Sequence, residues 1–189
     1  AMSMAYAILT TPEFDKLDSL FLYYFYGGWY RSGPNDIGNA TRAALRFFSF
    51  NNYNPKSEDD RKDINSKLKK TQDTNKNSLA NGFLMRISPL IVWCYYRFND
   101  LIKQAYEKED NGDELVKLFL KFKEEATKDN ACTHPNEETN CASACFCILA
   151  TGAIYGLKPS KIIENIKKLL NNPNFNDEKI EDKYFKNKV

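Results

Sequence analysis

Apolar residues recur along this sequence at helical spacing, and no stretch alternates between apolar and polar residues for long enough to support a sheet. In the segment 113–126, Leu115, Leu118 and Phe122 share one face, while lysines lie elsewhere. The spacing therefore predicts an all-α fold. The other predicted helices run from Pro12 to about Gly28, from an N-cap at Asp36, around Glu58 to Lys69, from near Gly82 to Tyr106, from about Pro135 to Tyr155, from Pro159 to Leu170, and over 177–187.

The length of 189 residues suits one domain with a sizeable core, because two domains of half that size would each be small for independent folding. We expect a single-domain multi-helix bundle over 1–189. The tract 51–77 is rich in Lys, Asn and Asp, and it is predicted to be a polar surface insertion that carries one exposed helix. The tail 171–189 is expected to pack loosely.

Charge and cysteine content limit the possible function classes. The 27 basic and 25 acidic residues give a net charge of +2, too weak a field to imply nucleic acid. The uncharged stretch between Glu138 and Lys158 is diluted by small and polar residues, so no membrane segment is expected. Five cysteines, four of them within sixteen positions, do not form a disulfide framework, and no secretory signal is visible. We therefore expect a cytoplasmic protein.

Three segments place small or glycine-containing backbone directly before a predicted helix, namely 32–45, 78–90 and 131–144. Such backbone exposes amide groups at the positive end of a helix, which suits a phosphate. Ordinary helix capping is the alternative, since Asn81-Gly82 before a helix is also a common turn. The third segment contains His134, the only histidine of the chain.

Together and in this order, the three segments resemble the ADP-ribosylglycohydrolase family. "DIGNATRAAL" is similar to the family's Asp-Ile-Gly-x-x-Thr-Arg-x-Ala-Leu segment, "NGFLMRISPL" to its Asn-Gly-x-x-Met-Arg-x-x-Pro-Leu segment, and "THP" to its Thr-His-Pro segment. "SMAYAIL", residues 3–9, is similar to the residues after the family's metal-binding Thr-Asp-Asp. The resemblance runs from about Ser3 to Leu170, and it implies part of the family's all-α fold.

The resemblance also implies a set of ligand-binding residues. Asn81 and Gly82, with the amides of Phe83 and Leu84, would cradle the diphosphate of ADP-ribose, and Phe83 would pack on the adenine or a ribose. Gly38 and Asn39 would form another wall of the ADP-ribose cleft. His134 would face the ribose or the phosphates. A structural histidine that bridges two helix ends is the alternative for His134. We expect Thr41 and Arg42 to support the loop from behind, and Met85 to lie in the core.

The family's two Mg²⁺ ions are held by aspartates of an N-terminal Thr-Asp-Asp segment and a C-terminal Asp-x-Asp-Ser/Thr segment, and neither segment is present here. Asp177, Glu181 and Asp182 do not reproduce the second segment, and the family's early Gly-Asp segment is also missing. We therefore expect a truncated member with no metal in this chain. Asp59 and Asp60, the only adjacent aspartates, are expected to compensate a helix dipole at the surface.

Cysteine and histidine allow a rival metal site. Cys132, His134, Cys141 and Cys145 could supply four ligands of two types, thiolate and imidazole, and both types suit Zn²⁺. Zinc ligands usually come as two tight pairs, however, whereas Cys141 and Cys145 fall on one helix face, as small core residues do. The spacing favours the core interpretation, and no catalytic cysteine is visible.

Two functions from different classes follow. The first is a shortened ADP-ribosylglycohydrolase that removes or recognises ADP-ribose, free or on a protein or small-molecule acceptor. The second is an inactive scaffold that acts through a protein partner or through self-association. Apolar surface left uncovered would drive that association, through the face of Phe21 to Tyr30 or the stretch from Trp93 to Phe98.

Overall fold

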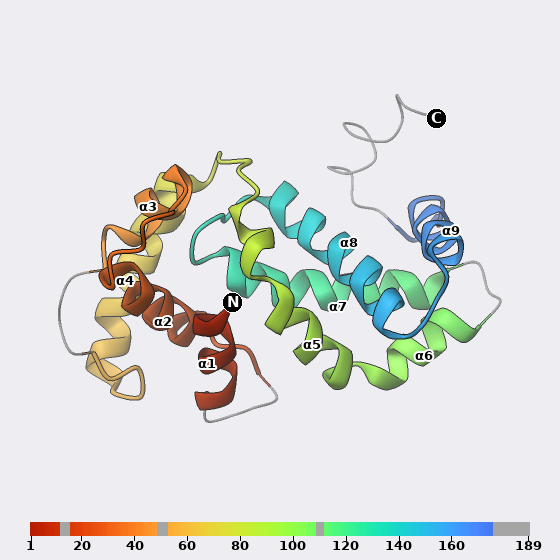
Figure 1. Ribbon diagram of the computed structural model, residues 1–189, viewed down its shortest axis with the longest axis horizontal. Helices are drawn as coiled ribbons and strands as arrows, with labels where there is room; N and C mark the ends of the chain where they lie inside the picture. Colours follow the sequence, from red (N-terminus) through yellow and green to blue (C-terminus); the bar gives the residue numbers. More distant parts are fainter. Residues whose placement is uncertain (12–15, 49–52, 109–111, 176–189) are drawn as a thin grey trace. The chain divides into compact units, whose positions relative to one another are not determined.

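The computed structural model describes residues 1–11, 16–48, 53–108 and 112–175 (Figure 1). Helices joined by loops make up this described part, which contains no strand, so the all-α prediction is confirmed. The elements are α1 (Met2–Thr10), α2 (Ser19–Arg31), α3 (Asn39–Leu45), α4 (Glu58–Asn75), the 3-10 helix η1 (Gly82–Arg86), α5 (Ser88–Arg97), α6 (Asn99–Glu107), α7 (Asp113–Asn130), α8 (Glu137–Ile154) and α9 (Pro159–Leu170).

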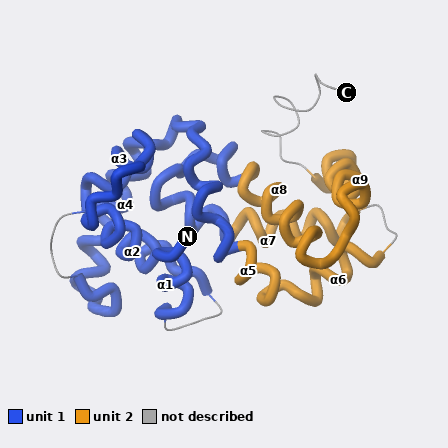
Figure 2. Tube along the Cα trace, in the orientation of Figure 1, with its two compact units in different colours: residues 1–90, 125–140 blue, residues 91–124, 141–189 orange. Residues whose placement is uncertain are grey.

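The chain divides into two compact units, coloured separately in Figure 2. Unit 1 comprises residues 1–90 and 125–140, and unit 2 comprises residues 91–124 and 141–189. The division falls inside α5, α7 and α8, so each of these helices contributes residues to both units. A single domain over 1–189 stays a prediction.

The core of unit 1 is built around α2. Phe21, Leu22 and Tyr26 of α2 are buried, and α1 packs on this helix through Met4 and Ala7. The start of α2 was predicted wrongly at Pro12, because Asp18 caps the helix: its carboxylate accepts a hydrogen bond of 2.8 Å from the Leu20 amide. Residues 12–15 lie outside the described part.

Helix α2 also continues past the expected end at Gly27 and Gly28 to Arg31. Gly27 is present because of packing and does not end the helix. A Cβ at this position would collide with the ring of Phe48, so the glycine permits the ring to approach the backbone of α2 closely. The chain turns only at Gly33, whose φ of +70° is in the left-handed region that favours glycine.

Helix α4 corrects the prediction of an exposed helix that ends at Lys69. It extends to Asn75 and buries a stripe of Ile64, Leu68, Thr71 and Asn75 at alternating spacings of four and three residues. The Thr71 hydroxyl donates to the carbonyl of Ala44 (2.6 Å) and lies 2.9 Å from the Tyr23 hydroxyl. A polar tract with so narrow a stripe thus packs against α2 and α3.

Two further boundaries differ from the predictions. Helix α3 begins at Asn39 with Gly38 as its N-cap, so the predicted cap at Asp36 is wrong. The helix predicted from near Gly82 to Tyr106 is divided into η1, α5 and α6, and Phe98 separates the last two with φ −111° and ψ 25°.

Unit 2 has a largely aromatic and aliphatic core. Leu118, Phe119 and Phe122 of α7 are fully buried, and Phe175 meets Phe119 edge-on with ring centroids 5.0 Å apart. Helices α7, α8 and α9 confirm the predictions at 113–126, 135–155 and 159–170. The helix predicted over 177–187 lies outside the described residues.

The surfaces expected to mediate self-association are mostly core. Phe21, Tyr26 and Trp93 are buried, and only Trp29 (37% exposed) and Tyr96 (75%) are exposed large aromatic residues in the two predicted stretches. Aromatic residues at helical spacing have packed inward, as their large apolar area favours. Self-association itself stays a prediction.

Candidate functional site

The three segments of the resemblance meet at Gly82, in unit 1. A Cβ placed on Gly82 would lie 3.3 Å from Cε1 and Nε2 of His134 and 3.5 Å from the hydroxyl oxygen of Thr41. Thr41 belongs to the first segment, Gly82 to the second and His134 to the third. We call Thr41, Gly82 and His134 the Gly82 site. Glycine is the residue that allows the imidazole to approach the backbone this closely.

The backbone at Gly82 is a tight 3-10 turn. Asn81 is the N-cap of η1, and the Leu84 amide donates to the carbonyl of Asn81 at 3.0 Å. That amide is therefore already used within the turn, whereas the resemblance implied that it would bind diphosphate. Asn81 is exposed, and Gly82 and Leu84 are half-buried.

His134 is fully buried, at 0% exposure, between the end of α7 and the start of α8. Its amide donates to the Asn130 carbonyl (2.7 Å), and its carbonyl accepts from the Thr139 hydroxyl (2.7 Å). These bonds join the two helix ends, as the structural alternative expected. Both bonds engage only the backbone N–H and C=O groups of His134, however, so the structural role does not require the imidazole.

The imidazole of His134 has one partnered and one unpartnered nitrogen. Nδ1 lies 2.8 Å from the Thr133 hydroxyl, whereas Nε2 is buried without a hydrogen-bond partner among the described residues. The ring also meets Phe83 edge-on, with centroids 5.8 Å apart. A buried polar atom without a partner costs free energy, so the Nε2 atom has a vacant hydrogen-bonding position beside Gly82.

The His134 ring is neutral near pH 7. Burial, and then the positive charge of Arg86, lower the pKa of His134 from 6.5 to about 4. A neutral imidazole carries one N–H. If the Thr133 hydroxyl donates to Nδ1, the proton of the neutral ring is on Nε2. The Nε2–H group then needs a hydrogen-bond acceptor, such as a phosphate oxygen.

A buried ion pair holds η1 in place. The Arg86 guanidinium donates to both carboxylate oxygens of Asp129, at 3.2 Å and 3.1 Å, and Asp129 also accepts from the Tyr26 hydroxyl at 2.5 Å. Arg86 lies over the Tyr26 ring, 4.6 Å from its centroid. Burial raises the pKa of Tyr26 well above its ordinary value, so the hydroxyl stays a donor. Such a satisfied cluster fixes the geometry of the turn that contains Gly82.

Helix α4 supports the site from a second side. The Asn75 side-chain amide donates to the carbonyls of Ala40 and Thr133, both at 2.7 Å. The Asn136 side chain donates to the Lys76 carbonyl at 2.8 Å. Asn75 therefore joins the first and third segments directly, although it comes from the tract predicted to be a surface insertion.

The structure separates the predicted site residues into buried and exposed groups. Phe83 is buried against His134, and Gly38 and Asn39 are exposed at the start of α3. Thr41 lies beside Gly82, as a supporting residue should, whereas Arg42 is exposed.

The prediction that Met85 lies in the core is wrong, since its side chain is 81% exposed. The segment is a 3-10 helix with three residues per turn, so Phe83 and Arg86 share the buried face and Met85 lies off it. An α-helical period does not apply here.

Sequence reasoning missed the supporting residues. Arg86 was part of a quoted motif without an assigned role, and neither Asp129 nor Asn75 was singled out. Each acts over a large sequence separation, which no local pattern reveals. The one available signal was indirect, because an arginine inside an apolar segment calls for a buried acidic partner.

The described residues do not fit a magnesium or zinc site. No group of three or more His, Cys, Asp or Glu side chains in the described part could hold a metal ion. Asp59 is exposed and pairs with Lys62 at 3.4 Å, and Asp60 accepts from the Asn54 amide at 2.7 Å, which agrees with surface roles at the start of α4. Asp177, Glu181 and Asp182 lie outside the described residues. We assign no metal-dependent step to the described residues.

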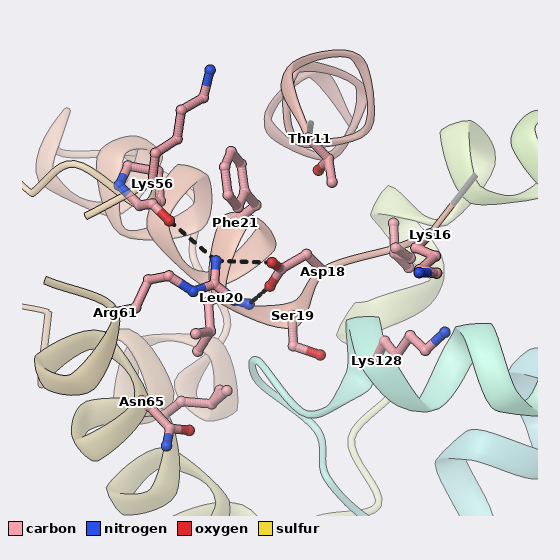
Figure 3. Close-up of a pocket in the computed structure, with 13 residues that line it drawn as sticks. Thr11, Lys16, Asp18, Ser19, Leu20, Phe21, Lys56, Arg61, Asn65 and Lys128 are labelled. Atoms are coloured by element: carbon pink, nitrogen blue, oxygen red, sulfur yellow. Dashed lines mark hydrogen bonds and ion pairs between the residues drawn. The ribbon is translucent and has the colours of Figure 1, made fainter. Parts of the chain in front are cut away.

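Unit 1 also contains a pocket away from Gly82. Figure 3 shows this cavity of about 740 Å³ near the starts of α2 and α4. Two of its cations have acidic partners: Arg61 pairs with Asp18 at 2.9 Å, and Lys128 with Glu125 at 2.9 Å. None of its lining residues belongs to the three resembling segments, so we place the candidate site at Gly82. The lining residues are Thr11, Lys16, Leu17, Asp18, Ser19, Leu20, Phe21, Pro55, Lys56, Arg61, Asn65, Leu68 and Lys128.

Comparison with known protein families matches residues 1–186 to the family described as ADP-ribosylglycohydrolase. No curated protein and no solved structure matches the chain. Within the described residues, no helix is long and apolar enough to cross a membrane.

Proposed function

We propose, from the premise that the chain belongs to the ADP-ribosylglycohydrolase family, that it binds ADP-ribose at the Gly82 site. The observation that carries this proposal is the meeting of Thr41, Gly82 and His134, one residue from each of three segments spread over about half of the chain. Capping alone would not require the three segments to share one point.

His134 is the residue proposed to contact the ligand. Its Nε2 atom has no partner among the described residues and lies beside the one position in η1 that has no side chain. A phosphate or ribose oxygen bound against Gly82 would complete the hydrogen bonding of the imidazole. Because Nε2 is buried, binding requires a small displacement of the η1 turn.

Gly38 and Asn39 are proposed to form a second wall of the ligand site, since they are exposed and are the N-cap and the first residue of α3, the helix that carries Thr41. Asn81 is proposed as a further contact, because its side chain is exposed at the N-cap of η1. The Leu84 amide is left out of the proposed contacts, as it is already bonded to Asn81.

The proposal is recognition of ADP-ribose, and removal of ADP-ribose from an acceptor is tested separately. Calorimetric titration with ADP-ribose, with and without Mg²⁺, measures recognition. Binding that is the same in both conditions is the expected result. Release of ADP-ribose from an ADP-ribosylated protein in the presence of Mg²⁺ would show that hydrolysis also occurs.

Glycine variants provide the site-specific test. Gly82→Val should abolish binding, because its side chain would occupy the space beside His134. The matched control is Gly28→Ala in α2, where the nearest atom to an added Cβ is the end of the Arg31 side chain at 4.0 Å. Equal ADP-ribose affinity in folded Gly82→Val and Gly28→Ala would contradict the proposal.

A scaffold function remains the second candidate, supported by one surface of α1. Met2, Tyr6 and Leu9 lie on one face of this helix and are 69%, 54% and 69% exposed. Apolar side chains gathered in this way favour contact with another chain. Self-association that weakens in a Tyr6→Lys, Leu9→Lys variant would support this function, and a monomer in light scattering at high concentration would contradict it.

A further inference from the structure

A second pocket of unit 1 is surrounded by arginines. It has a volume of about 490 Å³, within the range typical of small-molecule sites, and it lies where α2 and α3 end. We call it the arginine pocket. It is lined by Tyr30, Arg31, Gly33, Pro34, Ile37, Arg42, Arg46 and Phe48.

The lining of the arginine pocket is positively charged. Arg31, Arg42 and Arg46 contribute three guanidinium groups, and none of the described residues that line the cavity is acidic. Within the described residues, no carboxylate forms an ion pair with Arg42 or Arg46. The charge of the pocket is therefore not balanced by its own lining, in contrast to the cavity of Figure 3, where Asp18 lies against Arg61.

Two of the arginines are held by aromatic rings. Arg31 lies over the buried ring of Phe48, with its guanidinium carbon 5.2 Å from the centroid, and Arg46 lies over Phe47 at 4.9 Å. Stacking on a ring occupies one face of a guanidinium and fixes the direction of the N–H groups at its edge. The rings thus orient the guanidinium groups of Arg31 and Arg46.

Capping of the helix ends does not account for these arginines. At the end of α2, the carbonyls of Trp29 and Tyr30 already accept from the amides of Ser32 and Gly33, at 3.1 Å and 3.2 Å. At the end of α3, the Leu45 carbonyl accepts from the Phe48 amide at 3.0 Å. One cation in the last turn compensates the dipole of each helix, namely Arg31 in α2 and Arg42 in α3. Dipole compensation therefore leaves Arg46 without a structural reason.

We propose that the arginine pocket binds the phosphate group of an organic phosphate monoester. Guanidinium groups match the geometry of phosphate oxygens through paired N–H donors, and Arg42 and Arg46 supply two such groups that form no ion pair with a carboxylate of the described residues. Tyr30, Pro34 and Ile37 supply apolar and aromatic surface for the organic part of the ligand. This site shares no lining residue with the Gly82 site, so the two proposals are independent.

Phenyl phosphate is the probe, because it combines a phosphate monoester with an aromatic ring. Calorimetric titration should show binding that is tighter for phenyl phosphate than for inorganic phosphate and that weakens as salt is added. The double variant Arg42→Gln, Arg46→Gln should bind the probe at least about tenfold more weakly, because two charged hydrogen-bond donors are removed. Both side chains are exposed, so the variant should fold.

A control with the same change in net charge is Lys69→Gln, Lys103→Gln, which removes two exposed lysines outside the pocket lining. This control should bind phenyl phosphate as the wild type does, and so should Gly82→Val. Absence of binding to the wild-type chain, or equal weakening in the arginine and lysine variants, would overturn the proposal. Loss of probe binding in Gly82→Val would overturn the independence of the two sites, while ADP-ribose titration tests the Gly82 site on its own.

Discussion

The two units differ in what they bury. Unit 1 buries charged and polar side chains around η1, including Arg86, Asp129 and His134, whereas the core of unit 2 is mainly aliphatic and aromatic. The buried charged side chains of the described part, Arg86, Glu125 and Asp129, all belong to unit 1. Burying charge is costly unless each group is paired, and an apolar core of the same size is often at least as stable. Stability alone therefore explains the core of unit 2 but not that of unit 1, whose polar groups fix the backbone around Gly82.

The largest expected effect comes from breaking the buried ion pair. Asp129→Ala leaves the guanidinium of Arg86 buried without its carboxylate and should lower the free energy of unfolding by about 3–5 kcal/mol. Urea denaturation measures this loss. The double change Arg86→Met, Asp129→Leu should recover much of it, because an apolar pair leaves no unpaired charge. A cost below about 1 kcal/mol for Asp129→Ala would contradict the account of a tightly held turn.

A core substitution in unit 2 sharpens the comparison. Leu118 is fully buried, so Leu118→Ala should lower the free energy of unfolding by about 2–5 kcal/mol through lost burial and a residual cavity. Its affinity for ADP-ribose, measured by calorimetry on the folded variant, should equal that of the wild type. A marked loss of affinity would mean that unit 2 contributes to binding, contrary to the proposed site.

The acid dependence of stability should be traceable to His134. Well above pH 6.5 the ring is neutral in both the folded and the unfolded chain. Between pH 6.5 and about 4 the unfolded chain binds a proton that the folded chain does not, so stability falls as the pH falls, by up to about 3 kcal/mol. Urea denaturation as a function of pH measures this. His134→Gln should give a flatter curve over that range, and identical curves would show that His134 is not held neutral by burial.

The smallest effect is expected at the surface of α4. Asp59 pairs with Lys62 at 3.4 Å, but its side chain is 93% exposed, so Asp59→Ala should change the free energy of unfolding by less than about 1 kcal/mol. The same measurement on Asp129→Ala provides the contrast between an exposed and a buried aspartate. A loss of several kcal/mol at Asp59 would mean that the polar tract has a role beyond that of a solvated helix face.

Periodicity predicts the positions of the helices that are rich in apolar residues. Helices α7, α8 and α9 follow the predictions closely, whereas two of the four buried residues of α4, Thr71 and Asn75, are polar, so its sequence predicts an exposed helix. Local rules fail where a distant residue decides the outcome. The ring of Phe48 requires a glycine at position 27, whereas local sequence rules predict a helix end at this glycine. Met85 was misplaced because a 3-10 helix does not have the α-helical period.

The candidate site was predictable only in part. The three segments were found from their motifs, and Gly82 and His134 indeed lie together. The residues that support them were not found, because Asn75 and Asp129 act on carbonyl and guanidinium groups tens of positions away. Nor does the sequence reveal that His134 is buried, or that its Nε2 atom lacks a partner in the described part.

The single histidine allows one direct test of the proposed site. The ¹⁵N signals of the His134 imidazole, recorded near pH 7, should be those of a neutral ring, because the pKa is lowered to about 4. On addition of ADP-ribose, the Nε2 signal should shift as that atom gains a hydrogen-bond partner, and the Nδ1 signal, held by Thr133, should shift less. A chain that binds no ADP-ribose, or that binds it at saturation with both imidazole signals unchanged, would contradict the assignment of the Gly82 site as the ADP-ribose site.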